Sequence, residues 1–289
     1  MTVDIIIPTY NRVSFLTETL KSVQDQTYKD WFCWIAEDGE SPETRDAVRP
    51  FLTDNRFIHL PGSHVGYPAA PRNRAIRQGS APFVAFLDDD DLWLPEKLAQ
   101  QVEFLEHNKE CVLIGTNAFR WDGIGPKEEA PVYHRKISFG LIPYETLVQE
   151  NVFIISSVLT KRENLIKAGL FNENLTPPVG EDYELWLRLG ALGETWMLEH
   201  PLLIYRETAS TYYAKKMTRK AKYQIRADIY SAALQGMPDF PSPLATPGKN
   251  HYAELCRIER DFYRAGPRFM NKFRRAVSKK LNPLGALQK

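Results

Sequence analysis

Short apolar runs and segments of helical periodicity alternate along the first part of the chain. The apolar runs predict strands at residues 3–7, 31–36, 57–60, 83–87 and 112–115. Between them, apolar residues recur at helical spacing and predict helices at residues 14–23, 42–52, 71–78 and 95–105. Alternating elements of this length predict an α/β fold of the Rossmann-like, doubly wound kind, with a mostly parallel sheet and helices on both faces.

The middle of the chain is less regular. Residues 121–137 form a polar stretch with Gly, Pro and charged residues, where we expect a surface loop or hairpin. A strand is predicted at 154–159, and helices are predicted at 161–168 and 181–191. These elements extend the α/β pattern beyond the first five strands.

The character of the sequence changes near residue 210. A mixed-charge helix is predicted at residues 218–234 and a further helix at residues 250–264. A proline-rich connector at residues 237–247 joins them. We therefore expect one α/β domain at residues 1–210 and a helical C-terminal region at residues 211–289.

Composition narrows the range of partners and compartments. The 289 residues carry a formal net charge of +1, without the excess of Lys and Arg typical of nucleic-acid binding, so no nucleic-acid partner is expected. The cysteines, Cys33, Cys111 and Cys256, lie far apart and indicate reduced thiols in a cytoplasmic protein. The scattered histidines argue against a zinc site. A strand begins almost at once, so we expect no signal peptide, and no run approaches the roughly 20 apolar residues of a membrane span.

Four consecutive aspartates, residues 88–91, follow the predicted strand at 83–87. They stand at the carboxyl end of that strand, where open α/β sheets bind their ligands. Carboxylates held this close repel one another, so four together favour a cation that neutralises them. Oxygen ligands indicate Mg²⁺ or Mn²⁺, with a substrate phosphate completing the shell. The simpler alternative is a solvated acidic turn; the apolar strand before the run and Trp93 after it favour the metal site.

Other residues with useful chemistry also follow predicted strands. Residues 8–12 (Pro-Thr-Tyr-Asn-Arg) follow the first strand, Asp38 follows the second, and Arg72 and Asn73 lie in the helix after the third. An acidic side chain can accept from a nucleobase, an aromatic ring can stack on it, and an arginine can contact a phosphate. The chain contains no glycine-rich phosphate-binding loop, so a diphosphate must be bound by metal and arginine.

Five segments of this sequence, in this order, resemble the motifs of family 2 glycosyltransferases with the GT-A fold, of the bacterial polysaccharide or lipopolysaccharide type. The matching segments are residues 8–12, 38–39, 72–73, 87–91 and 180–188. The resemblance covers roughly residues 1–205. Each motif alone is weak evidence, whereas five in the same order are specific.

The resemblance implies a binding site for a nucleotide-diphosphate sugar, formed by residues at the strand ends. The nucleotide-binding residues it implies are Pro8, Thr9, Tyr10, Asn11, Asp38, Arg72, Asn73, Asp88 and Asp89. Asp88 and Asp90 match the family's DxD motif, which implies that they hold Mn²⁺ or Mg²⁺. The motif does not fix which of the four aspartates binds the ion, because its alignment on the run can shift by one residue.

Asp182, beside Glu181, resembles the family's catalytic base. Such a base removes the proton of the acceptor hydroxyl while its oxygen attacks the anomeric carbon, which inverts the configuration. The alternative is that both acids only stabilise the first turn of a helix. The four other motifs favour the base.

Three further residues are weaker candidates for contacts with the sugar or the acceptor, namely Trp93, Asp91 and Glu207. Trp93 offers an aromatic face, although such residues more often belong to the core. Many relatives carry a histidine after the last strand that joins the metal shell; here Glu207 stands there instead.

Residues 265–281 predict a basic amphipathic helix, with apolar residues on one face and Arg and Lys on another. Two interpretations stay open: peripheral contact with the inner face of the membrane, or a helix packed on the rest of the protein. A lipid-linked acceptor would give membrane contact a purpose.

Taken with the residues, the resemblance predicts a metal-dependent, inverting glycosyltransferase. It would move a sugar from a nucleotide-diphosphate sugar, of the UDP class, to a glycan or lipid-linked acceptor. The alternatives are a retaining transferase on the same fold and a non-catalytic module that binds nucleotide sugars. A nucleotidyltransferase is disfavoured, because the glycine-rich loop it would normally carry after the first strand is missing.

Overall fold

A computed structural model of the chain describes residues 1–134, 139–175, 179–207, 225, 228–229 and 232–233. The predicted connector at 237–247, the helix at 250–264, the tail at 265–281 and Cys256 lie outside the described residues, as does most of 218–234. The predicted domain boundary near residue 210 therefore stays a prediction. None of the helices within the described ranges has the length and apolar character needed to cross a bilayer.

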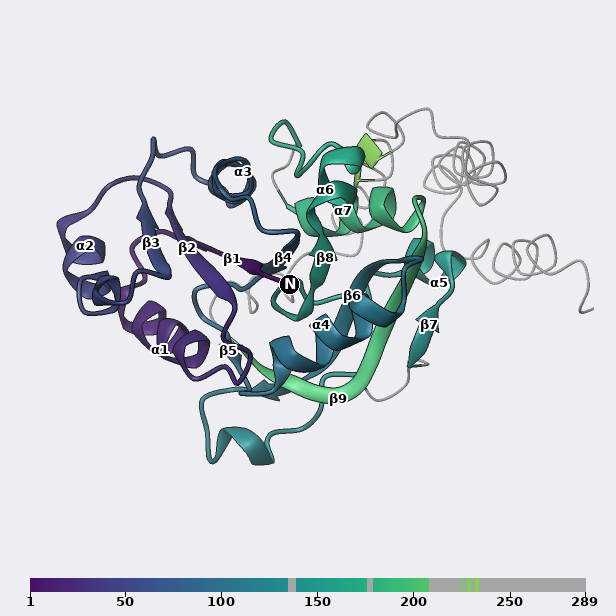
Figure 1. Cartoon of the computed structure of the whole chain (residues 1–289), viewed down its shortest axis with the longest axis horizontal. Helices are drawn as coiled ribbons and strands as arrows, with labels where there is room; N and C mark the ends of the chain where they lie inside the picture. Colours follow the sequence, from purple (N-terminus) through teal and green to yellow (C-terminus); the bar gives the residue numbers. More distant parts are fainter. Residues whose placement is uncertain (135–138, 176–178, 208–224, 226–227, 230–231, 234–289) are drawn as a thin grey trace, which may run out of the picture.

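Strands and helices alternate through the described chain (Figure 1). The strands are β1 Val3–Thr9, β2 Trp31–Glu37, β3 Phe57–Leu60, β4 Phe83–Phe86, β5 Leu92–Trp93, β6 Cys111–Trp121, β7 Gly140–Ile142, β8 Leu159–Lys161 and β9 Glu194–Arg206. The α-helices are α1 Val13–Gln24, α2 Pro42–Val48, α3 Ala69–Gln78, α4 Lys97–His107, α5 Tyr144–Gln149, α6 Arg162–Ala168 and α7 Glu181–Gly190. Short 3-10 helices are Phe51–Thr53, Lys127–Glu129 and Ile155–Ser157.

The described strands form one sheet in the order β3-β2-β1-β4-β8-β6-β9-β5, with β7 paired to β9. β1 runs parallel to β2 and β4, β2 runs parallel to β3, and β6 runs parallel to β9. β8 runs antiparallel between β4 and β6, and β5 and β7 run antiparallel to β9. The predicted α/β class and mostly parallel sheet are confirmed, and the antiparallel β8 is the main departure from a wholly parallel order.

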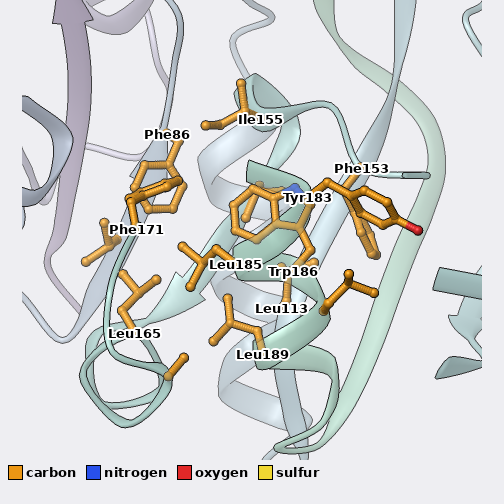
Figure 2. Packing of buried hydrophobic residues seen from close by; sticks show 14 of the residues in the cluster. Phe86, Leu113, Phe153, Ile155, Leu165, Phe171, Tyr183, Leu185, Trp186 and Leu189 are labelled. Atoms are coloured by element: carbon orange, nitrogen blue, oxygen red, sulfur yellow. The ribbon is translucent and has the colours of Figure 1, made fainter. Parts of the chain in front are cut away.

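Two apolar layers cover the two faces of the sheet. One cluster joins strand residues to α1 and α4 through Leu16, Leu20, Leu98 and Val102. The other joins the opposite face to α3, α6 and α7, and Figure 2 shows its centre, where Trp186 lies beside residues of the sheet. The rings that meet there come from three elements: Phe86, Phe171 and Trp186. Helices on both faces of the sheet confirm the doubly wound arrangement.

Local sequence explains where several helices begin and end. Ser41 caps α2, because its Oγ accepts a hydrogen bond from the Thr44 N–H at 3.0 Å, and Pro42 opens the helix. Gly169 ends α6 with a φ of 87°, a left-handed conformation that glycine adopts without strain. α6 ends at Ala168, as the sequence predicts.

The strand predicted at 154–159 is wrong in its first half. Residues Ile155–Ser157 form a 3-10 helix, and β8 begins only at Leu159. Apolar runs of this length do not distinguish a buried strand from a buried turn. Here the Ser157 hydroxyl donates to the Ile154 carbonyl at 2.6 Å, which closes the turn.

The long β9 has no counterpart among the predicted elements. It reaches from Glu194 to Arg206 beside β6, which itself continues to Trp121 rather than ending near 115. Register shifts interrupt the pairing of β6 with β9. Pro201 and its polar neighbours also break the alternation of apolar and polar residues, so the sequence does not indicate a strand there.

Candidate active site

The carboxyl ends of β1, β2 and β4 meet at one edge of the sheet, because these strands run parallel. β1 ends at Thr9, opposite Glu37 at the end of β2. The chain leaves β4 at Phe86 and enters the aspartate run at the same edge. Ligands of open α/β sheets bind at such an edge.

Three of the four aspartates turn toward one another there. One carboxylate oxygen from each of Asp88, Asp90 and Asp91 lies within 4.8 Å of the others. Asp91 is 1% exposed, and within the described ranges its buried Oδ2 has no hydrogen-bond partner. Burial raises the pKa of Asp91 well above its usual range, and the charges of Asp90 and Asp88 raise it further. A buried oxygen without a donor is costly unless a cation faces it, so these carboxylates fit Mg²⁺ or Mn²⁺.

This grouping places Asp91 beside Asp88 and Asp90, whereas the sequence assigned Asp91 to the sugar or the acceptor. Contacts from distant segments hold the group. The Arg206 N–H, at the end of β9, donates to Asp91 Oδ1 at 3.0 Å. Ser156 Oγ accepts from the Asp88 N–H at 3.0 Å. The aspartate loop is therefore fixed by β9 and by the 3-10 helix before β8.

Asp89 points away from that group, toward the end of β1. Thr9 Oγ1 donates to Asp89 Oδ2 at 2.8 Å, and Arg12 Nη1 lies 3.3 Å from Asp89 Oδ1. The same Arg12 nitrogen donates to Asp90 Oδ2 at 2.7 Å. Burial raises the pKa of Asp89 to about 6, although the Thr9 hydrogen bond and the Arg12 charge oppose the rise. Thr9 and Asp89, both predicted to bind the nucleotide, thus bind each other.

Arg72 connects the aspartate run to α7. Its side chain is almost fully buried, and it donates from Nη2 to Asp88 Oδ1 at 2.7 Å and from Nη1 to Glu181 Oε1 at 2.8 Å. A planar guanidinium holds two carboxylates in a fixed relative geometry, whereas the lysine ammonium is a point charge on a flexible stem. The first turn of α7, which carries Glu181 and Asp182, therefore lies next to the candidate metal site.

Asp182 is half-buried at the start of α7. Burial raises the pKa of its carboxyl to about 7, and the neighbouring charge of Glu181 raises it as well. Hydrogen bonds from the Tyr183 N–H at 2.7 Å and from Asn151 Nδ2 at 3.2 Å act in the opposite direction. A carboxyl group with a pKa near neutrality is suited to accept a proton from a hydroxyl.

Asp38 and Tyr10 lie together at the end of β2. Asp38 accepts hydrogen bonds from the Val65 and Gly66 N–H groups, both at 2.8 Å, and His64 Nδ1 lies 3.0 Å from its Oδ2. Tyr10 is 47% exposed and stacks on the His64 ring, with centroids 4.3 Å apart. An exposed ring beside a carboxylate suits the binding of a nucleobase. In this structure residues 64–66 contact the same ring and carboxylate.

Two other residues of the first motif have backbone roles. Pro8 is buried within β1, opposite Ala36 of β2. Asn11 is exposed in the turn to α1 with a φ of 52°, a conformation that Asn adopts more readily than most residues. The turn they form brings Arg12 back over the aspartates.

Asn73 lies inside the protein, apart from the aspartates. Its Nδ2 donates to the Phe171 carbonyl at 2.8 Å and to Glu173 Oε1 at 2.7 Å, and its Oδ1 accepts from the Phe171 N–H at 3.0 Å. With 1% exposure, Asn73 ties α3 to the loop after α6. Its amide is fully used by protein groups, which argues against the predicted contact with the nucleotide.

Trp93 and Glu207 are also engaged within the protein. Trp93 is 3% exposed, its Nε1 donates to the Ser156 carbonyl at 2.8 Å, and Lys97 Nζ lies 4.1 Å above its ring. The burial of the Trp93 ring in the core argues against the predicted sugar contact, which stays a prediction. Glu207 forms an ion pair with Arg120 at the end of β6.

Several residues of the site have no part in the predicted set, among them Arg12, His64, Asn151, Ser156 and Arg206. Arg12 stands inside a matched motif, so its charge was a usable signal. The others reach the site from segments without a local motif, and only the fold brings them there.

The sequence model described as "Glycosyl transferase family 2" matches residues 4–167. The chain belongs to glycosyltransferase family 2. The family that the resemblance predicts is confirmed. One relative of this chain is the UDP-Glc:alpha-D-GlcNAc-diphosphoundecaprenol beta-1,3-glucosyltransferase WfgD of Escherichia coli, 34% identical over 113 residues, or 39% of this chain and 44% of the relative. The chain spans between 26% and 44% of the length of this and other curated relatives.

Solved structures with low sequence identity show the fold of this chain. Residues 1–349 of S. aureus TarS, in complex with UDP-GlcNAc, match with a TM-score of 0.67 and 18% identity over 89% of this chain and 70% of that chain. The mannosyltransferase PcManGT from Pyrobaculum calidifontis, in complex with GDP-Man and Mn²⁺, matches with a TM-score of 0.61 and 17% identity over 97% of this chain and 80% of that chain. The predicted GT-A fold is confirmed.

Proposed function

We propose that this glycosyltransferase moves a sugar from a UDP-sugar to a hydroxyl of a glycan or lipid-linked acceptor, with inversion at the anomeric carbon. The observation that carries the proposal is the Arg72 guanidinium, which joins Asp88 of the aspartate group to Glu181 at the start of α7. A site for the diphosphate and a site for proton removal would thereby be neighbours.

In this mechanism Asp182 is the general base. Its carboxylate takes the proton of the acceptor hydroxyl as the hydroxyl oxygen bonds to the anomeric carbon. The bond from that carbon to the diphosphate oxygen breaks at the same time, and the nucleoside diphosphate leaves. A pKa near 7 leaves a large fraction of Asp182 ionised at neutral pH. Asn151 orients the carboxylate through its hydrogen bond at 3.2 Å.

Asp88, Asp90 and Asp91 would hold the divalent ion, Mn²⁺ or Mg²⁺. When bound, such an ion stabilises the negative charge that develops on the leaving diphosphate. Tyr10 and Asp38 would receive the nucleobase, once the 64–66 loop yields one of its hydrogen bonds to Asp38. The UDP donor named for WfgD and the UDP-GlcNAc bound to TarS support a UDP-sugar, whereas PcManGT is in complex with GDP-Man.

The acceptor proposal rests on the relative. WfgD is named for a diphosphoundecaprenol acceptor, which supports a lipid-linked glycan and, with it, a place at the cytoplasmic face of the membrane. Membrane contact through residues 265–281 stays a prediction, because that segment lies outside the described residues.

The experiment has two stages. A thermal-shift panel of nucleotide sugars, with Mn²⁺ and with EDTA, identifies the donor by the rise in Tm that ligand binding gives. The donor is then incubated with a GlcNAc-diphosphate lipid analogue, and NMR of the product reports the anomer. We expect an inverted linkage; a retained linkage contradicts the mechanism, and no Tm response to any nucleotide sugar contradicts the proposal as a whole.

A further inference from the structure

Arg12 holds two neighbouring aspartates with one nitrogen. Its Nη1 lies 2.7 Å from Asp90 Oδ2 and 3.3 Å from Asp89 Oδ1. Asp90 also contributes an oxygen to the group with Asp88 and Asp91 that fits a divalent ion. The Asp90 carboxylate thus belongs both to an ion pair with Arg12 and to the candidate metal site.

The two arginines at this edge are held very differently. Arg72 is 3% exposed in its side chain and bonded to carboxylates on two elements, so it is fixed in place. The Arg12 side chain is 39% exposed, at the turn into α1. The partly exposed Arg12 side chain can exchange its partners, because a solvent-exposed arginine has many accessible rotamers.

We propose that Arg12 is the exchangeable counter-ion of Asp90: it neutralises Asp90 in the metal-free protein and, when a divalent ion takes Asp90, turns to the diphosphate of the donor. This inference rests on the proposed function. Arginine suits the second role, because its planar fork binds phosphate oxygens in pairs.

A variant that lacks the positive charge of Arg12 should show opposite changes in its affinity for the ion and for UDP. In the absence of nucleotide, Arg12 competes with the ion for Asp90, so Arg12→Gln should bind the ion more tightly. In the presence of the ion, Arg12 contributes to diphosphate binding, so the same variant should bind UDP more weakly. Arg12 thereby makes ion and diphosphate binding cooperative, and couplings of this kind are about 5- to 150-fold.

The test measures binding rather than turnover, on the full chain. Free Mn²⁺ is followed by electron paramagnetic resonance during titration without nucleotide, and UDP affinity is measured by calorimetry at saturating Mn²⁺. Arg12→Gln should bind Mn²⁺ about fivefold or more tightly and UDP about fivefold or more weakly than the unmodified protein. Arg12→Lys, which keeps the charge, should resemble the unmodified protein in Mn²⁺ affinity. Arg49→Gln, at an exposed ion pair with Asp46, is the matched control and should change neither affinity.

Equal or weaker Mn²⁺ binding by Arg12→Gln overturns the inference, and so does unchanged UDP affinity at saturating Mn²⁺. The proposed function fails in a different way. If the unmodified protein binds no more Mn²⁺ than Asp91→Asn, the aspartate group holds no ion, whatever Arg12 does.

Discussion

Asp88 and Glu181 bind the same guanidinium, because Arg72 Nη2 lies 2.7 Å from Asp88 Oδ1 and Arg72 Nη1 lies 2.8 Å from Glu181 Oε1. Asp88 follows β4 at the centre of the sheet, and Glu181 opens α7, which packs on one face of it. Without Arg72, two carboxylates this near to each other would repel, and the first turn of α7 would lose its link to the aspartate run. The arrangement would let the proposed proton acceptor and the proposed diphosphate site act on one sugar.

The first prediction concerns the proposed base. Asp182→Asn should lower the rate of sugar transfer by about 10²- to 10⁴-fold, because an amide cannot take the acceptor proton. UDP affinity should stay within about twofold, since other residues are proposed to bind the nucleotide. Asp46→Asn on α2, whose side chain is exposed, controls for the substitution itself. Full transfer by Asp182→Asn in a single-turnover assay would remove Asp182 from the mechanism.

The second prediction concerns pH. The carboxyl of Asp182 accepts a proton only when ionised, so kcat/KM should fall as pH drops below about 7, the raised pKa of this group. Asn151 stabilises the ionised form, so Asn151→Ala should raise this pKa and move the acidic limb of the profile to higher pH. A pH-rate profile of both proteins decides. An acidic limb that stays in place in Asn151→Ala would show that another group controls it.

The third prediction separates two interpretations of Asn73. Asn73→Ala leaves the Phe171 N–H and carbonyl buried without their partner, which should lower the free energy of unfolding by about 1–3 kcal/mol. UDP affinity should not change. Urea unfolding and calorimetry measure the two effects, with the exposed Asn55→Ala as the control. Unchanged stability together with a tenfold loss of UDP affinity would restore the nucleotide contact that the sequence predicts.

Asn73 also shows what a motif can and cannot predict. The motif places Arg72 and Asn73 side by side, but consecutive helical residues face different directions. Arg72 turns to the aspartates, whereas Asn73 turns to Phe171 in the loop after α6. The sequence could not distinguish them, because the partner of Asn73 lies far along the chain.

The convergence of the strand ends was predictable, because parallel strands must present their carboxyl ends at one edge. The grouping of Asp91 with Asp88 and Asp90 was not. It depends on the Arg206 N–H at the end of β9, a strand whose proline and register shifts hide it from pattern analysis. The burial of Trp93 was hidden for a similar reason, since its partner Ser156 lies in a 3-10 helix where a strand was predicted.

The fourth prediction concerns the C-terminal region. Ile229 is 5% exposed within the apolar cluster around α7, and its side chain lies against Gly180, which precedes Glu181 with a φ of 77°. Ile229→Ala should therefore lower the free energy of unfolding by about 2–4 kcal/mol. Ile166→Ala on α6, where the side chain is 63% exposed, should cost far less. Equal losses in urea unfolding would mean that residue 229 does not pack on the domain in solution.

The central claim is that the aspartate group, through a divalent ion, binds the diphosphate of a UDP-sugar. The most direct measurement is UDP affinity by calorimetry, with Mn²⁺ and with EDTA, for the unmodified protein and for Asp91→Asn. We predict that Mn²⁺ strengthens UDP binding by about tenfold or more in the unmodified protein and has little effect in Asp91→Asn. Equal UDP affinity with Mn²⁺ and with EDTA in the unmodified protein would contradict the claim.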